Sequence, residues 1–199
     1  MQRPALALLL LATTFLAGCD ETDAVAVRVR VEDDLTGTVT VNALELPASG
    51  GAAVEASKGA DWTARVGIVC NTGTFQELGR LELADIAFAG GSNPSGLVYA
   101  TVTLPRGEKA VWPKKLVPLS ADDRTKSAKA FDPSGKTAEV GATVKLEFTL
   151  PSSVIGNGLL GKTRGVRLSS DGNVATLLVP IDVALSAGEP LVWHMTWQR

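Results

Sequence analysis

The sequence predicts an all-β fold, an antiparallel β-sandwich-like domain of about nine strands with one short helix, following a cleaved signal peptide. Two observations predict the sandwich. Apolar and polar side chains alternate in many segments, as they do in a strand that buries one face. The 20 glycines and 10 prolines supply the turns that such a fold requires. No segment recurs at a fixed spacing, which argues against a propeller or a solenoid.

The first predicted strands form a hairpin. Valines at every second position alternate with polar or small residues over Val25–Glu32, and the alternation resumes over Thr38–Leu44. The intervening Asp33–Gly37 segment consists mostly of turn-forming residues.

Alternation predicts seven further strands: Trp62–Cys70, Arg80–Phe88, Leu97–Leu104, Thr143–Leu150, Thr163–Leu168, Val174–Ile181 and Leu191–Gln198. In the second of these, the apolar parity switches near Ala84-Asp85, which predicts a β-bulge, with a helix as the alternative. Asp171-Gly172-Asn173 lies between two predicted strands and suits a hairpin turn, because Gly and Asn tolerate positive φ.

The predicted helix begins after Ser120. Asp123 follows this serine at the spacing of a helix-capping pair, and the stretch to Phe131 is rich in Ala and Lys.

The N-terminus has the pattern of an export signal. Arg3 precedes an apolar run, Ala5–Ala17, which ends in small residues. This run is shorter than the roughly 20 residues that a membrane-spanning helix needs, so we expect a cleaved signal peptide.

Leu16-Ala17-Gly18-Cys19 resembles the lipobox of bacterial lipoproteins. The resemblance implies that residues 1–18 are removed, that Cys19 receives diacylglycerol and acyl chains, and that residues 19–23 form a short tether. We therefore expect a membrane-anchored protein that faces the periplasm or the cell exterior, with one β-rich domain over residues 24–199. The choice between inner and outer membrane stays open, and no cofactor besides the lipid is expected.

Cys70 is the second of two cysteines, at the end of the predicted Trp62–Cys70 strand. The alternation in this strand places the thiol on the apolar face. Because acylation would occupy the sulfur of Cys19, we expect a buried thiol at Cys70 and no intramolecular disulfide.

Residues 105–142 lack sustained alternation and form a long basic loop. Eight basic and four acidic residues lie between Arg106 and Lys136, although the whole chain has a formal charge of −2. Long loops often carry function. We therefore predict a contact surface for an envelope protein or an anionic lipid, made by Trp112, Lys114, Lys115, Lys126 and Lys129. The alternative is a solvated loop.

The sequence predicts no catalytic residue and no metal site. Its single histidine, His194, has the polar parity of its strand, which predicts a solvent-facing side chain. Gly156–Gly161 matches Gly-x-Gly-x-x-Gly, but a β-like run follows it, so we expect a glycine-rich loop and no phosphate site. The near-neutral charge also argues against nucleic-acid binding.

Two functional hypotheses remain. The leading one is a non-enzymatic binding or assembly module of the cell envelope. The alternative is a carbohydrate-binding protein, with Trp193 and Trp197 as a stacking platform, or an enzyme that acts on carbohydrates through carboxylates.

Overall fold

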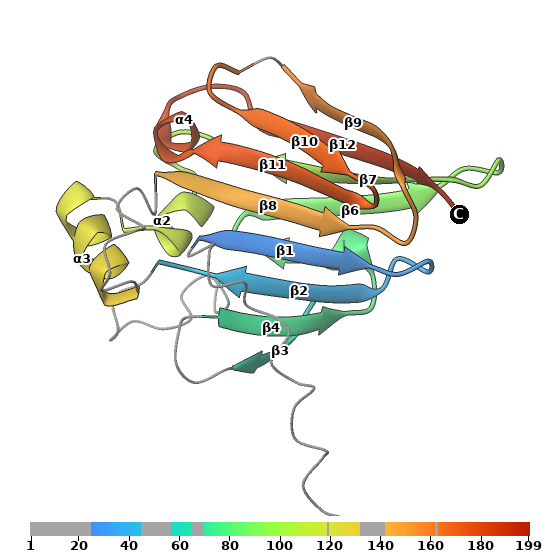
Figure 1. The fold of residues 1–199 in the computed structure, drawn as a ribbon, viewed down its shortest axis with the longest axis horizontal. Coiled ribbons are helices and arrows are strands. Elements are labelled where there is room, and N and C mark those ends of the chain that lie inside the picture. Colours follow the sequence, from blue (N-terminus) through green and yellow to red (C-terminus); the bar gives the residue numbers. More distant parts are fainter. Residues whose placement is uncertain (1–24, 45–56, 65–69, 119, 132–141, 162) are drawn as a thin grey trace, which may run out of the picture.

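The computed structural model describes residues 25–44, 57–64, 70–118, 120–131, 142–161 and 163–199. In this part of the chain, twelve strands form two sheets that pack face to face (Figure 1). The predicted all-β sandwich-like fold is confirmed.

The larger sheet has the strand order β10-β11-β8-β1-β2-β4-β3. Its strands are β1 (Ala26–Val31), β2 (Gly37–Asn42), β3 (Asp61–Ala64), β4 (Cys70–Phe75), β8 (Thr143–Thr149), β10 (Arg167–Asp171) and β11 (Val174–Pro180). Neighbouring strands are antiparallel, except for the parallel pair β1 and β8.

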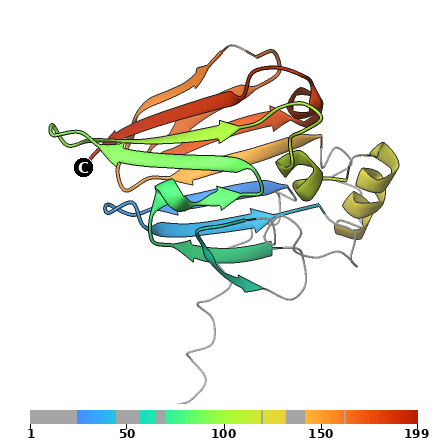
Figure 2. The ribbon, with the colours of Figure 1, turned by 180° about the vertical axis from the view of Figure 1, so that it is seen from behind.

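The smaller sheet has the order β5-β6-β7-β12-β9 and is antiparallel throughout. Its strands are β5 (Glu82–Leu83), β6 (Ile86–Ser92), β7 (Leu97–Leu104), β9 (Val154–Leu160) and β12 (Leu191–Gln198). This sheet lies in front in Figure 2.

The core fills the space between the two sheets, and alternation selects its residues. On β12, Trp193, Met195 and Trp197 are buried and point toward the larger sheet. Phe148 of β8 meets the Trp193 ring edge-on, with ring centroids 5.5 Å apart. Such aromatic contacts add about 0.5–1.5 kcal/mol to the burial itself.

The predicted Trp62–Cys70 strand is wrong. The chain instead forms the antiparallel pair β3 and β4, in which Trp62 lies opposite Gly73. Since successive side chains alternate between faces, Cys70 points away from the face that carries Trp62.

Cys70 is buried, as expected, but it is disulfide-bonded. The expected thiol is therefore wrong. The other cysteine of the sequence, Cys19, lies outside the described residues.

The predicted bulge at Ala84-Asp85 is a two-residue turn. Leu83 of β5 pairs directly with Ile86 of β6, and Ala84 has a φ of 55°. The apolar parity switches here because the chain reverses direction. By contrast, the predicted turn at Asp171-Gly172-Asn173 is confirmed, with Gly172 at a φ of 54° between β10 and β11.

The predicted glycine-rich loop is also wrong, because Gly156 and Gly158 lie within β9. This strand forms one edge of the smaller sheet, and its exposed side carries glycines where a central strand would need larger residues. The apolar alternation that marks the other strands is therefore missing from its sequence.

The predicted helix is confirmed as α3 (Ala121–Phe131). The backbone N–H of Asp123 donates to Oγ of Ser120 at 3.0 Å, and the serine hydroxyl donates to the Asp123 carboxylate at 2.7 Å. Shorter elements that the sequence did not predict are η1 (Leu78–Arg80), α2 (Trp112–Leu116) and α4 (Ile181–Leu185). None of the helices in the described residues is long and apolar enough to cross a membrane.

Candidate functional site

The long basic loop of residues 105–142, called the basic segment below, begins with a buried tryptophan rather than with solvated residues. Trp112, in the first turn of α2, is 0% exposed, and its indole N–H donates to the carbonyl of Pro105 at 2.9 Å. Leu116 at the other end of α2 is equally buried. The prediction that Trp112 is a contact residue is wrong, because its side chain is needed in the core.

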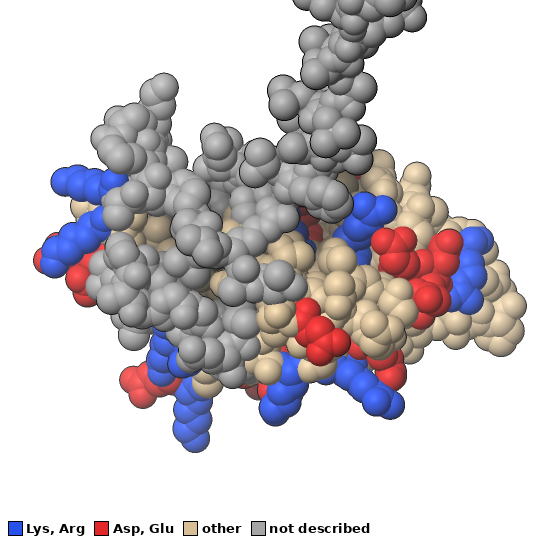
Figure 3. All heavy atoms as spheres, turned by 90° about the horizontal axis from the view of Figure 1, so that it is seen from below, with Lys and Arg blue, Asp and Glu red and all other residues tan. Residues whose placement is uncertain are grey.

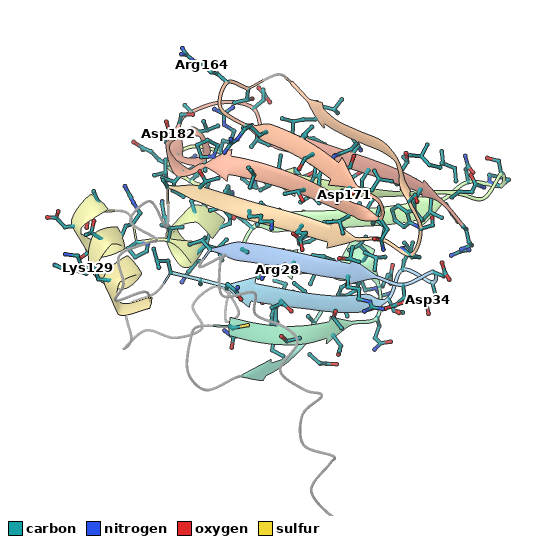
Figure 4. All side chains as sticks on the ribbon, viewed as in Figure 1. Arg28, Asp34, Lys129, Arg164, Asp171 and Asp182 are labelled. Carbon is teal, nitrogen blue, oxygen red and sulfur yellow. The ribbon has the colours of Figure 1, made fainter. Side chains whose placement is uncertain are left out.

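The four predicted lysines lie at one end of the sandwich, on α2 and α3 (Figure 1). Lys114 is exposed and donates to the carbonyl of Glu108, whereas Lys115 is half-buried. Lys126 is exposed and lies 3.5 Å from the carboxylate of Asp123. Lys129 points away from the sheets (Figure 4). A binding role for the four lysines stays a prediction.

The helical end of the sandwich is also the end at which the chain enters the domain. Ala26, the first residue of β1, pairs with Asn42 of β2. Two residues further on, the N–H of Leu44 donates to the carbonyl of Leu116 in α2 at 2.9 Å. Cys19 precedes Val25 by six positions, and an extended chain covers at most about 3.6 Å per position. The chain therefore allows at most about 20 Å between Cys19 and this end.

The two tryptophans proposed as a sugar platform are in the core. Trp193 is 0% exposed and Trp197 is 1% exposed, because both point toward the larger sheet. The indole N–H of Trp193 is satisfied by Oδ1 of Asn157 on β9, at 2.6 Å. The platform prediction is wrong.

The outer face of the smaller sheet carries a surface that sequence reasoning missed. Three rows of side chains cross β6, β7, β12 and β9 in register, and we name them the uncharged face. The rows are Ala87-Thr103-Val192-Leu160, Ala89-Thr101-His194-Gly158 and Gly91-Tyr99-Thr196-Gly156. Each row ends at β9, and none contains an Asp, Glu, Lys or Arg from β6 to β9. Beyond the first row, Glu82 of β5 lies opposite Ala87 and pairs with Lys58.

His194 lies in the middle row. It is half-buried rather than fully solvent-facing, and its Nδ1 lies 2.8 Å from Oγ1 of Thr101 on β7. In the part of the chain that the structure describes, no group of three or more His, Cys, Asp or Glu residues could hold a metal ion. His194 is thus a hydrogen-bonding member of the uncharged face.

Glycines allow the uncharged face to lie flat. A Cβ at Gly91 would lie 2.7 Å from the Tyr99 hydroxyl, so the tyrosine ring extends across Gly91. A Cβ at Gly156 would lie 2.5 Å from Oγ1 of Thr196. Tyr99 remains 45% exposed and Leu160 60% exposed. The side chains therefore lie along the sheet and leave a broad, shallow surface.

The outer face of the larger sheet is different in charge. Arg28 on β1 lies 3.6 Å from the carboxylate of Glu147 on β8, and Lys145 lies 2.8 Å from the same carboxylate. Basic and acidic side chains also stand beside one another along the lower edge of the sandwich, which Figure 3 shows from below. Paired charges of this kind are usual on a solvated sheet, so the uncharged face is the exception.

The polar positions of two predicted strands carried the signal for this face. In Leu97–Leu104 these positions are Leu97, Tyr99, Thr101 and Thr103, and in Leu191–Gln198 they are Val192, His194, Thr196 and Gln198. All eight lack charge. Their neighbours could not be identified from sequence, because β9 was not recognised as a strand.

Comparison with known proteins does not assign the chain to a family. No family model matches the chain, and no curated protein matches it. Among solved structures, the chain is similar to the NMR structure of the folded domain of LppM from Mycobacterium tuberculosis, with 11% sequence identity and a TM-score of 0.39. The likeness covers 89% of this chain and 92% of that domain. At this level no residue of LppM assigns a role to a position in this chain.

Proposed function

We propose that the protein is a lipoprotein of the bacterial cell envelope, tethered through lipid on Cys19, and that its sandwich is a non-enzymatic module that binds a protein partner through the uncharged face. The lipobox-like Leu16–Cys19 sequence supports the tether. A diacylated cysteine would anchor the chain stably, since one acyl chain alone binds a membrane only marginally.

The uncharged face is the observation that carries the binding proposal. The centres of protein interfaces are depleted in charged residues and enriched in aromatic ones, with tyrosine prominent. The face has this composition, with Tyr99 and Leu160 exposed and no charge across its three rows. A partner could cover it without desolvating an unpaired ion, which would otherwise oppose binding.

A neutral glycan is the runner-up partner. The hydroxyl groups of Thr101, Thr103 and Thr196 could bond to sugar hydroxyls. Sugar recognition also relies on exposed aromatic rings for stacking, and Tyr99 is the single exposed ring in the three rows, since the sandwich buries both tryptophans of β12. The flat, partly apolar face therefore favours a protein.

In-cell photocrosslinking tests the binding proposal. A photoreactive amino acid at Ala89, exposed on the uncharged face, should crosslink a specific envelope protein, and Ala89→Lys should abolish its co-purification. Thr74 on β4, also exposed but on the other sheet, provides the matched control for both changes. Adducts to glycan alone, or equal crosslinking from both positions, would overturn the proposal.

Mass spectrometry of the protein extracted from membranes tests the tether. The N-terminal peptide should begin at Cys19 and carry a thioether-linked diacylglycerol, whereas Cys19→Ser should leave the signal peptide uncut. Cys19 is the one other cysteine in the sequence that could pair with Cys70, and one sulfur cannot carry both a thioether and a disulfide. The proposed tether therefore requires a mature chain without the Cys70 disulfide, and recovery of Cys19 in a disulfide would contradict lipidation.

A further inference from the structure

One side of the sandwich has two open strand edges. β9 ends the smaller sheet and β10 ends the larger one. In the described residues, β9 pairs only with β12, and β10 pairs only with β11. Both strands lie at the same upper edge in Figure 1. Each strand therefore directs half of its backbone N–H and C=O groups away from the sheet.

The β9 edge lacks most of the features that keep edge strands apart. Its sequence contains no proline and no charged residue, and Ile155 and Leu160 are 62% and 60% exposed. A bulge opposite Thr196 and Trp197 affects only the beginning of the strand. Gly156–Leu160 remains regular, uncharged and available for strand pairing.

The middle of the β9 edge lies against the middle of the β10 edge. The side-chain amide of Asn157, in the middle of β9, donates to the carbonyl of Ser169, in the middle of β10, at 2.7 Å. A two-fold axis perpendicular to both sheets could therefore pass beside both residues. Rotation about this axis would bring β9 antiparallel to β9 of a second copy, and β10 antiparallel to β10.

The charges of β10 fit this rotation. Arg167 begins the strand and Asp171 ends it, and both side chains are exposed. An antiparallel β10 pair places Arg167 of one copy opposite Asp171 of the other, twice by symmetry. Arg164 lies beyond the same end as Arg167 (Figure 4), so it would also approach Asp171 of the second copy. The β9 strands add no repulsion, since neither carries a charge.

We propose that this edge is a homodimer interface, in which β9 and β10 of two copies pair antiparallel about a two-fold axis near Asn157 and Ser169. The pairing extends each sheet across the dimer. It also brings the two uncharged faces side by side on the same surface, because the axis is perpendicular to the sheets.

Photocrosslinking of the full-length, lipidated protein in its membrane tests the dimer. A photoreactive amino acid at Ser169 should join two differently tagged copies of the chain, because residue 169 meets itself across the axis. The same amino acid at Ser95, exposed in the β6–β7 turn, provides the control and should not join them.

Charge reversal supplies a second test. Arg167→Asp opposes two aspartates across each contact, and Asp171→Arg opposes two arginines. Each single change should weaken association of detergent-extracted protein about tenfold, since two surface ion pairs become repulsive. The double variant Arg167→Asp/Asp171→Arg restores opposite charges and should recover the affinity.

The results separate the dimer from other assemblies. Crosslinking at Ser169 that the single changes reduce and the double change recovers supports the interface. Crosslinking of Ser169 only to a different protein overturns it. So does an association affinity that neither single change weakens. Neither test changes a residue of the uncharged face, because Arg167, Ser169 and Asp171 all lie on β10 of the larger sheet.

Discussion

The carboxylate of Asp85 accepts a hydrogen bond from the backbone N–H of Trp112 at 2.7 Å, and a second from the N–H of Val111 at the same distance. Asp85 lies in the β5–β6 turn, 27 residues before Trp112. It thus caps α2 from another part of the chain, because α2 has no side-chain cap of its own. The two bonds fix the start of the basic segment against the sandwich.

Asp85→Ala should lower the free energy of unfolding by about 2–3 kcal/mol. The change leaves two amide groups without their charged acceptor, and a lost acceptor costs about 1–3 kcal/mol when the donor is buried. Asp61→Ala, at an exposed position on β3, provides the control and should change stability by less than about 0.5 kcal/mol. Urea unfolding measures both. Equal stability of the two variants would contradict the capping role.

Asn157→Leu should destabilise the protein by about 1–3 kcal/mol, because the buried indole N–H of Trp193 loses its acceptor. In a Trp193→Phe background the same change should cost less, since phenylalanine has no N–H to satisfy. A double-mutant cycle by chemical denaturation isolates this coupling. A coupling energy near zero would show that the bond contributes nothing.

Strong alternation made some elements predictable to the residue. β7 and β12 have the predicted bounds, because each has one buried and one exposed face over eight residues. β9 was missed for a physical reason. As an edge strand it needs no large side chain at Gly156 or Gly158, and without one its sequence has no period.

Local sequence patterns also limited what could be predicted of the candidate sites. The sequence showed where charge accumulates, in the lysines of α2 and α3, but not that Trp112 begins a helix and enters the core. Trp112 therefore looked like an exposed aromatic. The uncharged face depends on which strands become neighbours, and strand order is not encoded by local alternation.

Gly37→Ala should destabilise the β1–β2 hairpin strongly, by more than about 2 kcal/mol. A Cβ at Gly37 would lie 1.9 Å from the carbonyl oxygen of Arg30, so the backbone must shift. Gly158→Ala provides the matched control, because a Cβ there meets nothing within 4 Å. Its stability should stay the same or rise slightly. Thermal unfolding of both variants checks the contrast, and similar losses would contradict it.

The pKa of Asp34 is lowered from 3.8, chiefly because the hydroxyl of Thr36 donates to its carboxylate at 2.7 Å. Thr36→Val should raise this pKa toward 3.8, whereas Thr36→Ser keeps the donor and should leave it low. The lowered pKa stabilises the fold above pH 3.8, and this contribution is lost as the pH falls through the folded-state pKa. NMR titration of the Asp34 carboxyl group measures its pKa in both variants. Equal pKa values in Thr36→Val and Thr36→Ser would contradict the role of the hydroxyl.

The lysines of α2 and α3 should face the bilayer, because the proposed lipid on Cys19 would hold the helical end within about 20 Å of its attachment point. Anionic lipids attract basic residues by about 1 kcal/mol each, so lipidated protein in anionic vesicles should protect the α2 amides from hydrogen exchange more than in neutral vesicles. Replacing Lys114, Lys115, Lys126 and Lys129 with Ser should remove this difference, and so should 1 M salt. Arg30→Ser/Arg199→Ser, at the opposite end near the β1–β2 turn, should preserve it. Equal protection in both lipid mixtures would show that the helical end does not contact the membrane.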